Sequence, residues 1–245
     1  MGIHKASPLL WKKETDNPLQ VGDTYGVDVR CILYTILSTQ DIHRNLFRDP
    51  LASVKDLTTT WLDNWYRVHR FHRLNTKFVF VFDGHELGLK VRRRQLRRDH
   101  VRLWQAAAAA AKTWQEYDKA MSKLARVNGH LIRDFCDWVR SKLPSTQYCL
   151  FGAPFETDAQ LVYFEWIGLT DGTLSCDSDI FFYVFFYEVS ENVFSGFNTR
   201  STRKYRSIIK RQTVDPYFSS LRGEALRTLG CFMGTDYIQH LQGIG

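Results

Sequence analysis

Short apolar runs that alternate with helical segments constrain the fold of this chain more than any other feature of its sequence. The run at 77–84, KFVFVFDG, is apolar until its final Asp-Gly pair, which is typical of a central parallel strand buried on both faces. Runs at 24–29, 147–154 and 172–176 have a similar character. Strands that alternate with helices in this way predict an α/β fold with a mainly parallel central sheet flanked by helices.

The segments between these runs carry apolar residues at helical spacing. From Val54 onward, spacings of three or four predict one amphipathic helix that packs on the sheet, with a stripe made of Leu57, Trp61, Trp65, Val68 and Phe71. Further helices are expected at 31–37, 130–143, 157–169 and 216–229, and another strand after a turn within 180–189.

Residues from 86 to about 130 have a different character from the rest of the chain. An Arg-rich run leads into six alanines at 106–111 and then into a segment of strong helix formers. Their core-facing stripes are weak. This segment is therefore predicted to be an extended helical insertion that stands off the domain.

Composition limits the class of protein. With 245 residues and 44% hydrophobic content, the chain suits one folded unit, and we expect a single domain over 1–245. Its five cysteines include no CxxC pair, which argues against a disulfide framework or a zinc site. No segment has the apolar length of a signal peptide or membrane span, so we expect a soluble intracellular protein that does not contact membranes.

Acidic residues gather just past the apolar runs. Because the carboxyl ends of parallel strands meet at one edge of a sheet, these side chains would repel one another unless cations lay between them. The formal net charge of the chain is nevertheless +7, and a basic surface around an acidic centre suits a polyanion held by its backbone. The acidic residues are Asp28, Asp83, Glu156, Asp158, Asp177, Asp179 and Asp236.

The segments that carry these acids resemble the flap endonuclease and XPG family of structure-specific 5′ nucleases, including its 5′ exonuclease branch. The resemblance covers nearly the whole chain: MGI at the start, then VDV, VFDG, APFETDAQLVYFEWIGLTDGTLSCDSDI and LGCFMGTDYIQHLQGIG. It implies a PIN-like catalytic domain with a helical arch at about 86–130 and the start of a truncated helix-two-turn-helix at about 236–245. It also implies hydrolysis of phosphodiester bonds in DNA with a 5′ flap or 5′ end, as flap endonuclease or 5′-3′ exonuclease, in replication or repair.

The resemblance further implies two divalent ions. Oxygen-only ligands favour Mg²⁺ or Mn²⁺ over zinc, and two such ions can activate water and stabilise the leaving oxygen. Asp158 would lie close to both ions. The first site would be formed by Asp28, Asp83, Glu156 and Asp158, and the second by Asp177, Asp179 and Asp236.

Basic residues of the insertion match the same family. Lys90 and Arg97, seven residues apart on one helix face, correspond to the Lys and Arg that contact the scissile phosphate, so with Asp158 they are the predicted catalytic residues. Tyr34 stands where flap endonucleases stack a tyrosine on a base, although a half-buried helix tyrosine is an equal alternative. The remaining predicted nucleic-acid-binding residues, with a solvated face or loop as the alternative, are Arg92, Arg93, Arg94, Arg98, Arg102, Arg203, Lys204, Arg206, Lys210 and Arg211.

One departure from the family pattern affects the metal site. Val29 and Arg30 follow Asp28 where the family usually has small residues, which places a bulky cation beside the acids. Two alternative functions therefore stay open: a member of the family that binds or scaffolds nucleic acid without cleaving it, and an RNA-directed PIN-like nuclease. We expect a monomer in the nucleus, with the mitochondrion as the alternative, and contact with a sliding clamp only through a segment beyond Gly245.

Overall fold

The structure is a computed structural model of the protein. The residues that it describes are 11–13, 19–49, 53–85, 91–124, 126–177, 180, 183, 193–194 and 206–208.

Four adjacent parallel strands form the centre of the sheet. They lie in the order β5 (Gly172–Leu174), β2 (Thr24–Asp28), β3 (Lys77–Phe82) and β4 (Tyr148–Gly152). All three interfaces between them are parallel. The prediction of a mainly parallel sheet is therefore confirmed, and the four carboxyl ends lie at one edge.

Three short strands extend the sheet beyond β5. β6 (Val193–Phe194) is parallel to β5, whereas β7 (Arg206–Ile208) and β1 (Trp11–Lys13) add antiparallel pairings. The full order is β1-β7-β6-β5-β2-β3-β4. The sequence patterns predicted no strand at β1 or β7.

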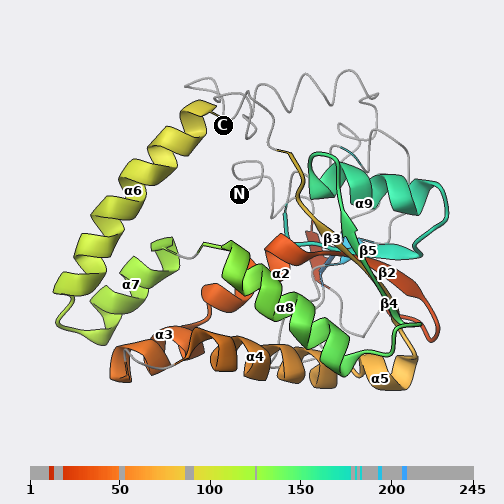
Figure 1. The fold of residues 1–245 in the computed structure, drawn as a ribbon, viewed down its shortest axis with the longest axis horizontal. Helices are drawn as coiled ribbons and strands as arrows, with labels where there is room; N and C mark the ends of the chain where they lie inside the picture. The colour runs from red at the N-terminus through yellow and green to blue at the C-terminus, as the bar shows by residue number, and fades with distance from the viewer. Residues whose placement is uncertain are drawn as a thin grey trace.

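Alternation along β3 explains why helices cover both faces of the sheet. Phe78 and Phe80 belong to the larger core cluster, on the face covered by α2 (Val29–Leu37), α4 (Val54–Val68) and α8 (Gly129–Lys142). Val79 and Val81 point the other way and pack with Leu161 of α9 (Thr157–Trp166). Figure 1 shows the sheet between α9 and the layer that contains α2 and α8.

The helix predicted to run from Val54 through Phe71 is wrong in its extent. α4 ends at Val68, and Arg70 adopts a left-handed conformation with φ 57° before the four-residue helix α5 (Phe71–Leu74) begins. The chain therefore turns, but Phe71 stays in the core with its ring centroid 4.9 Å from that of Trp65. The apolar stripe correctly indicates which residues are buried on both sides of the turn, but it does not indicate that the helix is continuous.

Two helices occupy the predicted insertion. α6 (Val91–Ala110) and α7 (Trp114–Leu124) form a hairpin that extends away from the sheet (Figure 1). The turn between them has a capping box, because Glu116 Oε2 accepts the backbone N–H of Thr113 at 3.2 Å and Thr113 Oγ1 accepts that of Glu116 at 3.3 Å.

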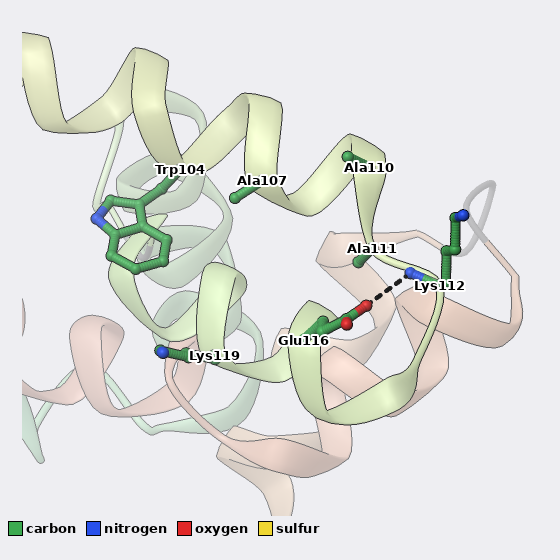
Figure 2. Close-up of a pocket in the computed structure, with 7 residues that line it drawn as sticks. All are labelled: Trp104, Ala107, Ala110, Ala111, Lys112, Glu116 and Lys119. Carbon is green, nitrogen blue, oxygen red and sulfur yellow. Dashed lines mark hydrogen bonds between the residues drawn. The ribbon is translucent and has the colours of Figure 1, made fainter.

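A groove of about 380 Å³ lies between these two helices. Ala107, Ala110 and Ala111 line one side of the groove, so no bulky side chain fills it there. Figure 2 shows Glu116 hydrogen-bonded to the backbone N–H of Lys112 at one end of the groove, with Trp104 and Lys119 farther along. The groove belongs to the hairpin and is remote from the edge of the sheet where the acidic residues lie.

The hairpin extends from the body as predicted, but it also contacts the body through one helix. α7 packs against α3 (Gln40–Arg48), a helix that the sequence patterns did not predict. The buried His43 lies between two acceptors, with Nδ1 2.7 Å from Asp118 Oδ1 and Nε2 2.8 Å from the carbonyl of Leu37. Beside it, Phe47 packs against Trp114.

Among the described helices, none combines the length and the apolar character that a membrane-spanning segment needs.

Candidate functional site

Five of the seven predicted acids lie at or just beyond the carboxyl ends of the four central strands. Asp28 is the last residue of β2, Asp83 directly follows β3, and Asp177 lies three residues after β5. Glu156 and Asp158 stand at the start of α9, which follows β4. Asp179 and Asp236 lie outside the described residues.

Asp28 is the most buried of these carboxylates. It is 5% exposed and caps α2, because its Oδ1 accepts the backbone N–H of Cys31 at 3.0 Å. Burial raises the pKa of Asp28 to about 6; hydrogen bonding from Cys31 opposes the shift, and the charges of Asp83 and Asp177 add to it. The protein thus holds a carboxylate where its negative charge is poorly stabilised by the surrounding groups.

Asp83 has the opposite environment on the neighbouring strand. Its Oδ1 accepts the backbone N–H of Thr157 at 3.1 Å and the hydroxyl of Thr157 at 2.8 Å, while its Oδ2 accepts from Nη1 of Arg30 at 2.5 Å. Partial burial raises the pKa of Asp83, but the bonds from Thr157 and Arg30 and the guanidinium charge outweigh it. The pKa of Asp83 therefore lies below its ordinary value.

Gly84 fixes the loops that carry the acids. A Cβ at this position would lie 1.8 Å from the carbonyl oxygen of Ala153, so only glycine fits. The backbone N–H of Gly84 donates to the carbonyl of Phe155 at 2.7 Å, and that of Ala153 donates to Phe82 at 2.9 Å. These contacts hold the segment that leads to Glu156 beside the end of β3.

Two curated proteins whose names refer to DNA are similar to this chain in sequence. No protein-family model matches the chain. DNA damage-inducible protein DIN7 of Saccharomyces cerevisiae is 33% identical over 120 residues, which cover 46% of this chain and 26% of that protein. Exodeoxyribonuclease 1 of Schizosaccharomyces pombe is 28% identical over 184 residues, or 74% of this chain and 31% of that protein. The chain thus spans less than a third of the length of each relative.

Solved structures match nearly the whole chain. The catalytic core of Rad2 in complex with DNA substrate superposes with a TM-score of 0.61 at 21% identity, covering 98% of this chain and 63% of that one. Human GEN1 in complex with Holliday junction DNA gives 0.61 at 17% identity, with 99% and 52% covered. Flap endonuclease-1 from Methanococcus jannaschii gives 0.59 at 19% identity, with 100% and 74% covered.

The chain has the flap endonuclease and XPG nuclease fold. The PIN-like architecture predicted from the sequence is thereby confirmed, as is the resemblance from which it was drawn. In this fold the five described residues of the predicted acidic set lie at the carboxyl edge of the parallel sheet, where open α/β structures place their sites.

The chemistry of this edge in the flap endonuclease and XPG fold fits a divalent cation. Its donors are carboxylate oxygens, and the buried Asp28 lies within the electrostatic reach of two further acids, so a cation there would stabilise its charged form. In the described part of the chain, no group of three or more potential ligands is close enough to hold a metal ion. Oδ2 of Asp83 is instead hydrogen-bonded to the Arg30 guanidinium.

Sequence reasoning assigned no role to three neighbours of the acids. Thr157 anchors Asp83, and Ser175 accepts the backbone N–H of Asp177 at 3.2 Å. Cys31 lies 3.7 Å from Ser175 Oγ; a hydrogen bond with Cys176 and burial raise the pKa of the Cys31 thiol well above its ordinary value, so it is neutral. Thr157 and Ser175 lie within two residues of predicted acids in the sequence, whereas the contact of Cys31 with Ser175 joins segments 144 residues apart.

The predicted phosphate-binding residues are described only in part. Arg98 and Arg102 are exposed on α6, and Tyr34 is 47% exposed on α2, away from the core side of that helix. The backbones of Arg92, Arg93, Arg94 and Arg97 belong to α6 and that of Arg206 to β7. The positions outside the described residues are Lys90, Arg203, Lys204, Lys210 and Arg211.

Proposed function

We propose that the chain is a divalent-metal-dependent, structure-specific 5′ nuclease that hydrolyses phosphodiester bonds in DNA with a 5′ flap or 5′ end, in replication or repair. The observation that carries this proposal is the buried Asp28 at the end of β2, with Asp83 and Asp177 at the ends of the strands on either side. The likeness to exodeoxyribonuclease 1 and to the DNA-bound core of Rad2 supports DNA as the substrate.

The proposed ligands divide between two ions, Mg²⁺ or Mn²⁺. Asp28, Asp83, Glu156 and Asp158 would hold the first, and Asp177 with the predicted Asp179 and Asp236 the second. Bound ions of this kind lower the pKa of an attacking water and stabilise charge on the phosphodiester oxygens.

The protein's own contribution is to fix the carboxylates before a cation arrives. The N–H of Cys31 orients Asp28, and the two donors of Thr157 orient Asp83. Because both carboxylates are already held, little reorganisation is needed when charge develops on the phosphate. In this proposal Lys90 and Arg97 face the phosphate from the side opposite the acids.

A cleavage assay on a labelled 5′-flap duplex with Mg²⁺ or Mn²⁺ tests the proposal. We expect Asp158→Asn to lower single-turnover cleavage by about a thousandfold, because a neutral amide cannot replace a ligand shared by both ions. Asp137→Asn, an exposed carboxylate on α8, is the matched control and should cleave like the parent. A parent rate no greater than that of Asp158→Asn would refute nuclease activity. Matched RNA flaps in the same assay define the sugar preference.

A second candidate function is nucleic-acid binding without cleavage. The Arg30–Asp83 ion pair favours it, because it occupies an oxygen that the nuclease needs for a metal ion. Titration of the metal-free chain with Mn²⁺ separates the two: a protein that binds flap DNA but shows no Mn²⁺ binding sensitive to Asp158→Asn is a binding module.

A further inference from the structure

Arg30 joins the ends of two neighbouring strands. It is the second residue of α2, two positions after Asp28, and it reaches across the edge of the sheet to Asp83, 53 residues away in the sequence. The Nη1 to Oδ2 distance is 2.5 Å. The charged donor and acceptor form an ion pair as well as a hydrogen bond.

The two oxygens of Asp83 have different partners. Oδ1 accepts both donors of Thr157, whose side chain is buried at the first turn of α9, so this oxygen contributes to the fold. Oδ2 faces Arg30, whose side chain is 60% exposed. A cation that approaches Asp83 must therefore use the oxygen that Arg30 already contacts.

We propose that Arg30 competes with the divalent cation for Asp83 and so lowers the affinity of the site for metal. This inference rests on the proposed metal site. In the metal-free protein the guanidinium offsets the negative charge that Asp83 contributes beside the buried Asp28. When a divalent ion arrives, two cations cannot share Oδ2 at contact distance, and the exposed Arg30 turns out to solvent.

Arg30, and not Asp83, is the residue that moves when the ion binds, because the Arg30 side chain is the more exposed of the two. Thr157 keeps Asp83 in place through Oδ1, so the carboxylate stays at the edge when Arg30 leaves. The long and exposed Arg30 side chain loses little by leaving, since solvent-exposed ion pairs contribute little to stability. The energetic penalty on metal binding then comes from the repulsion between the ion and the nearby guanidinium together with the lost pair.

Calorimetric titration of the metal-free chain with Mn²⁺ tests the competition without any need for cleavage. The variants are Arg30→Ala, Arg30→Lys and, as control, Arg140→Ala, which removes the same charge from an exposed position near the end of α8. We expect Arg30→Ala to bind Mn²⁺ about tenfold more tightly than the parent and Arg30→Lys to lie between them, because a lysine keeps the charge but not the fork geometry. Arg140→Ala should bind like the parent.

Thermal unfolding gives a second readout on the same proteins, and Arg30→Gln serves if Arg30→Ala does not fold. The Mn²⁺-induced rise in Tm should be larger in the Arg30 variants than in the parent, because tighter binding to the native state stabilises it more. Equal or weaker Mn²⁺ binding in these variants would overturn the competition while leaving the nuclease proposal intact. Absence of Mn²⁺ binding in every protein would overturn both the competition and the metal site.

Discussion

The carboxyl edge of the sheet and the α6–α7 hairpin differ in how firmly their charged side chains are held in place. At the edge, Asp28 and Asp83 are held by hydrogen bonds from Cys31 and Thr157 at the ends of buried strands. On the hairpin, Arg98 and Arg102 are exposed, and the described contacts with the body pass through α3. Ligands for a small ion need fixed geometry, whereas contacts with a phosphate backbone need mainly charge at the right distance.

Packing differs between the two regions in the same way. β2 and β3 lie between two clusters of buried apolar side chains, with ring contacts such as that of Phe78 with Phe80, whose centroids are 5.2 Å apart. α7 meets the body through His43 and the ring of Phe47. Local opening should therefore be far easier in the hairpin than at the edge.

The largest predicted effect on stability comes from adding a side-chain carbon at the edge of the sheet, where there is no space for it. Gly84→Ala places a Cβ 1.8 Å from the carbonyl oxygen of Ala153, which is a rigid backbone atom. We expect a loss of about 4 kcal/mol in the free energy of unfolding, together with loss of metal binding. Denaturant unfolding measures the first. Gly129→Ala, where a Cβ meets nothing within 4 Å, is the control and should not destabilise the protein. Similar stabilities of the two variants would contradict a tightly packed edge.

A smaller effect, of about 3 kcal/mol, should appear in the pH dependence of stability without metal. Because the folded-state pKa of Asp28 is raised from 3.8 to about 6, the folded state binds the extra proton between these values, and this group lowers stability as pH rises through them. Asp28→Asn does not titrate, so its stability relative to the parent should increase from pH 4 to pH 7. The lowered pKa of Asp83 acts in the opposite direction and at lower pH.

Chemical denaturation in EDTA at several pH values measures this difference. Asp137→Asn, which removes an exposed carboxylate, should track the parent at every pH. If the difference in unfolding free energy between Asp28→Asn and the parent stays constant from pH 4 to pH 7, burial does not destabilise the ionised form of Asp28 and the inference is wrong.

We expect Lys90, from the predicted arch, to affect the cleavage rate more than the stability of the protein. If Lys90 steadies phosphate charge in the transition state, Lys90→Ala should lower single-turnover cleavage of a 5′-flap duplex by about a hundredfold while DNA binding weakens only modestly. Unfolding free energy should stay close to that of the parent. Arg140→Ala, at an exposed position near the end of α8, is the matched control for charge and should cleave like the parent. An unchanged cleavage rate would remove Lys90 from the mechanism.

The sequence predicted the edge better than the contacts across it. The apolar run of β3 and the acid after it placed Asp83 correctly, because strands buried on both faces have a composition that few other elements share. The turn at Arg70 was not visible, since a left-handed conformation outside glycine has only a weak sequence signal. Neither the pairing of Arg30 with Asp83 nor that of His43 with Asp118 was predictable, because their partners are 53 and 75 residues apart.

The smallest predicted effect concerns that last contact. Asp118→Ala removes the acceptor from Nδ1 of the buried His43, and we expect a loss of about 1 kcal/mol that is confined to the hairpin. Hydrogen exchange should show amides of α7 exchanging about fivefold faster, with those of β2 and β3 unchanged. Lys119→Ala, at an exposed position on the same helix, should leave both regions as they are. Equal acceleration in α7 and β3 would mean that the hairpin and the edge unfold as one unit, which would remove the physical distinction between them.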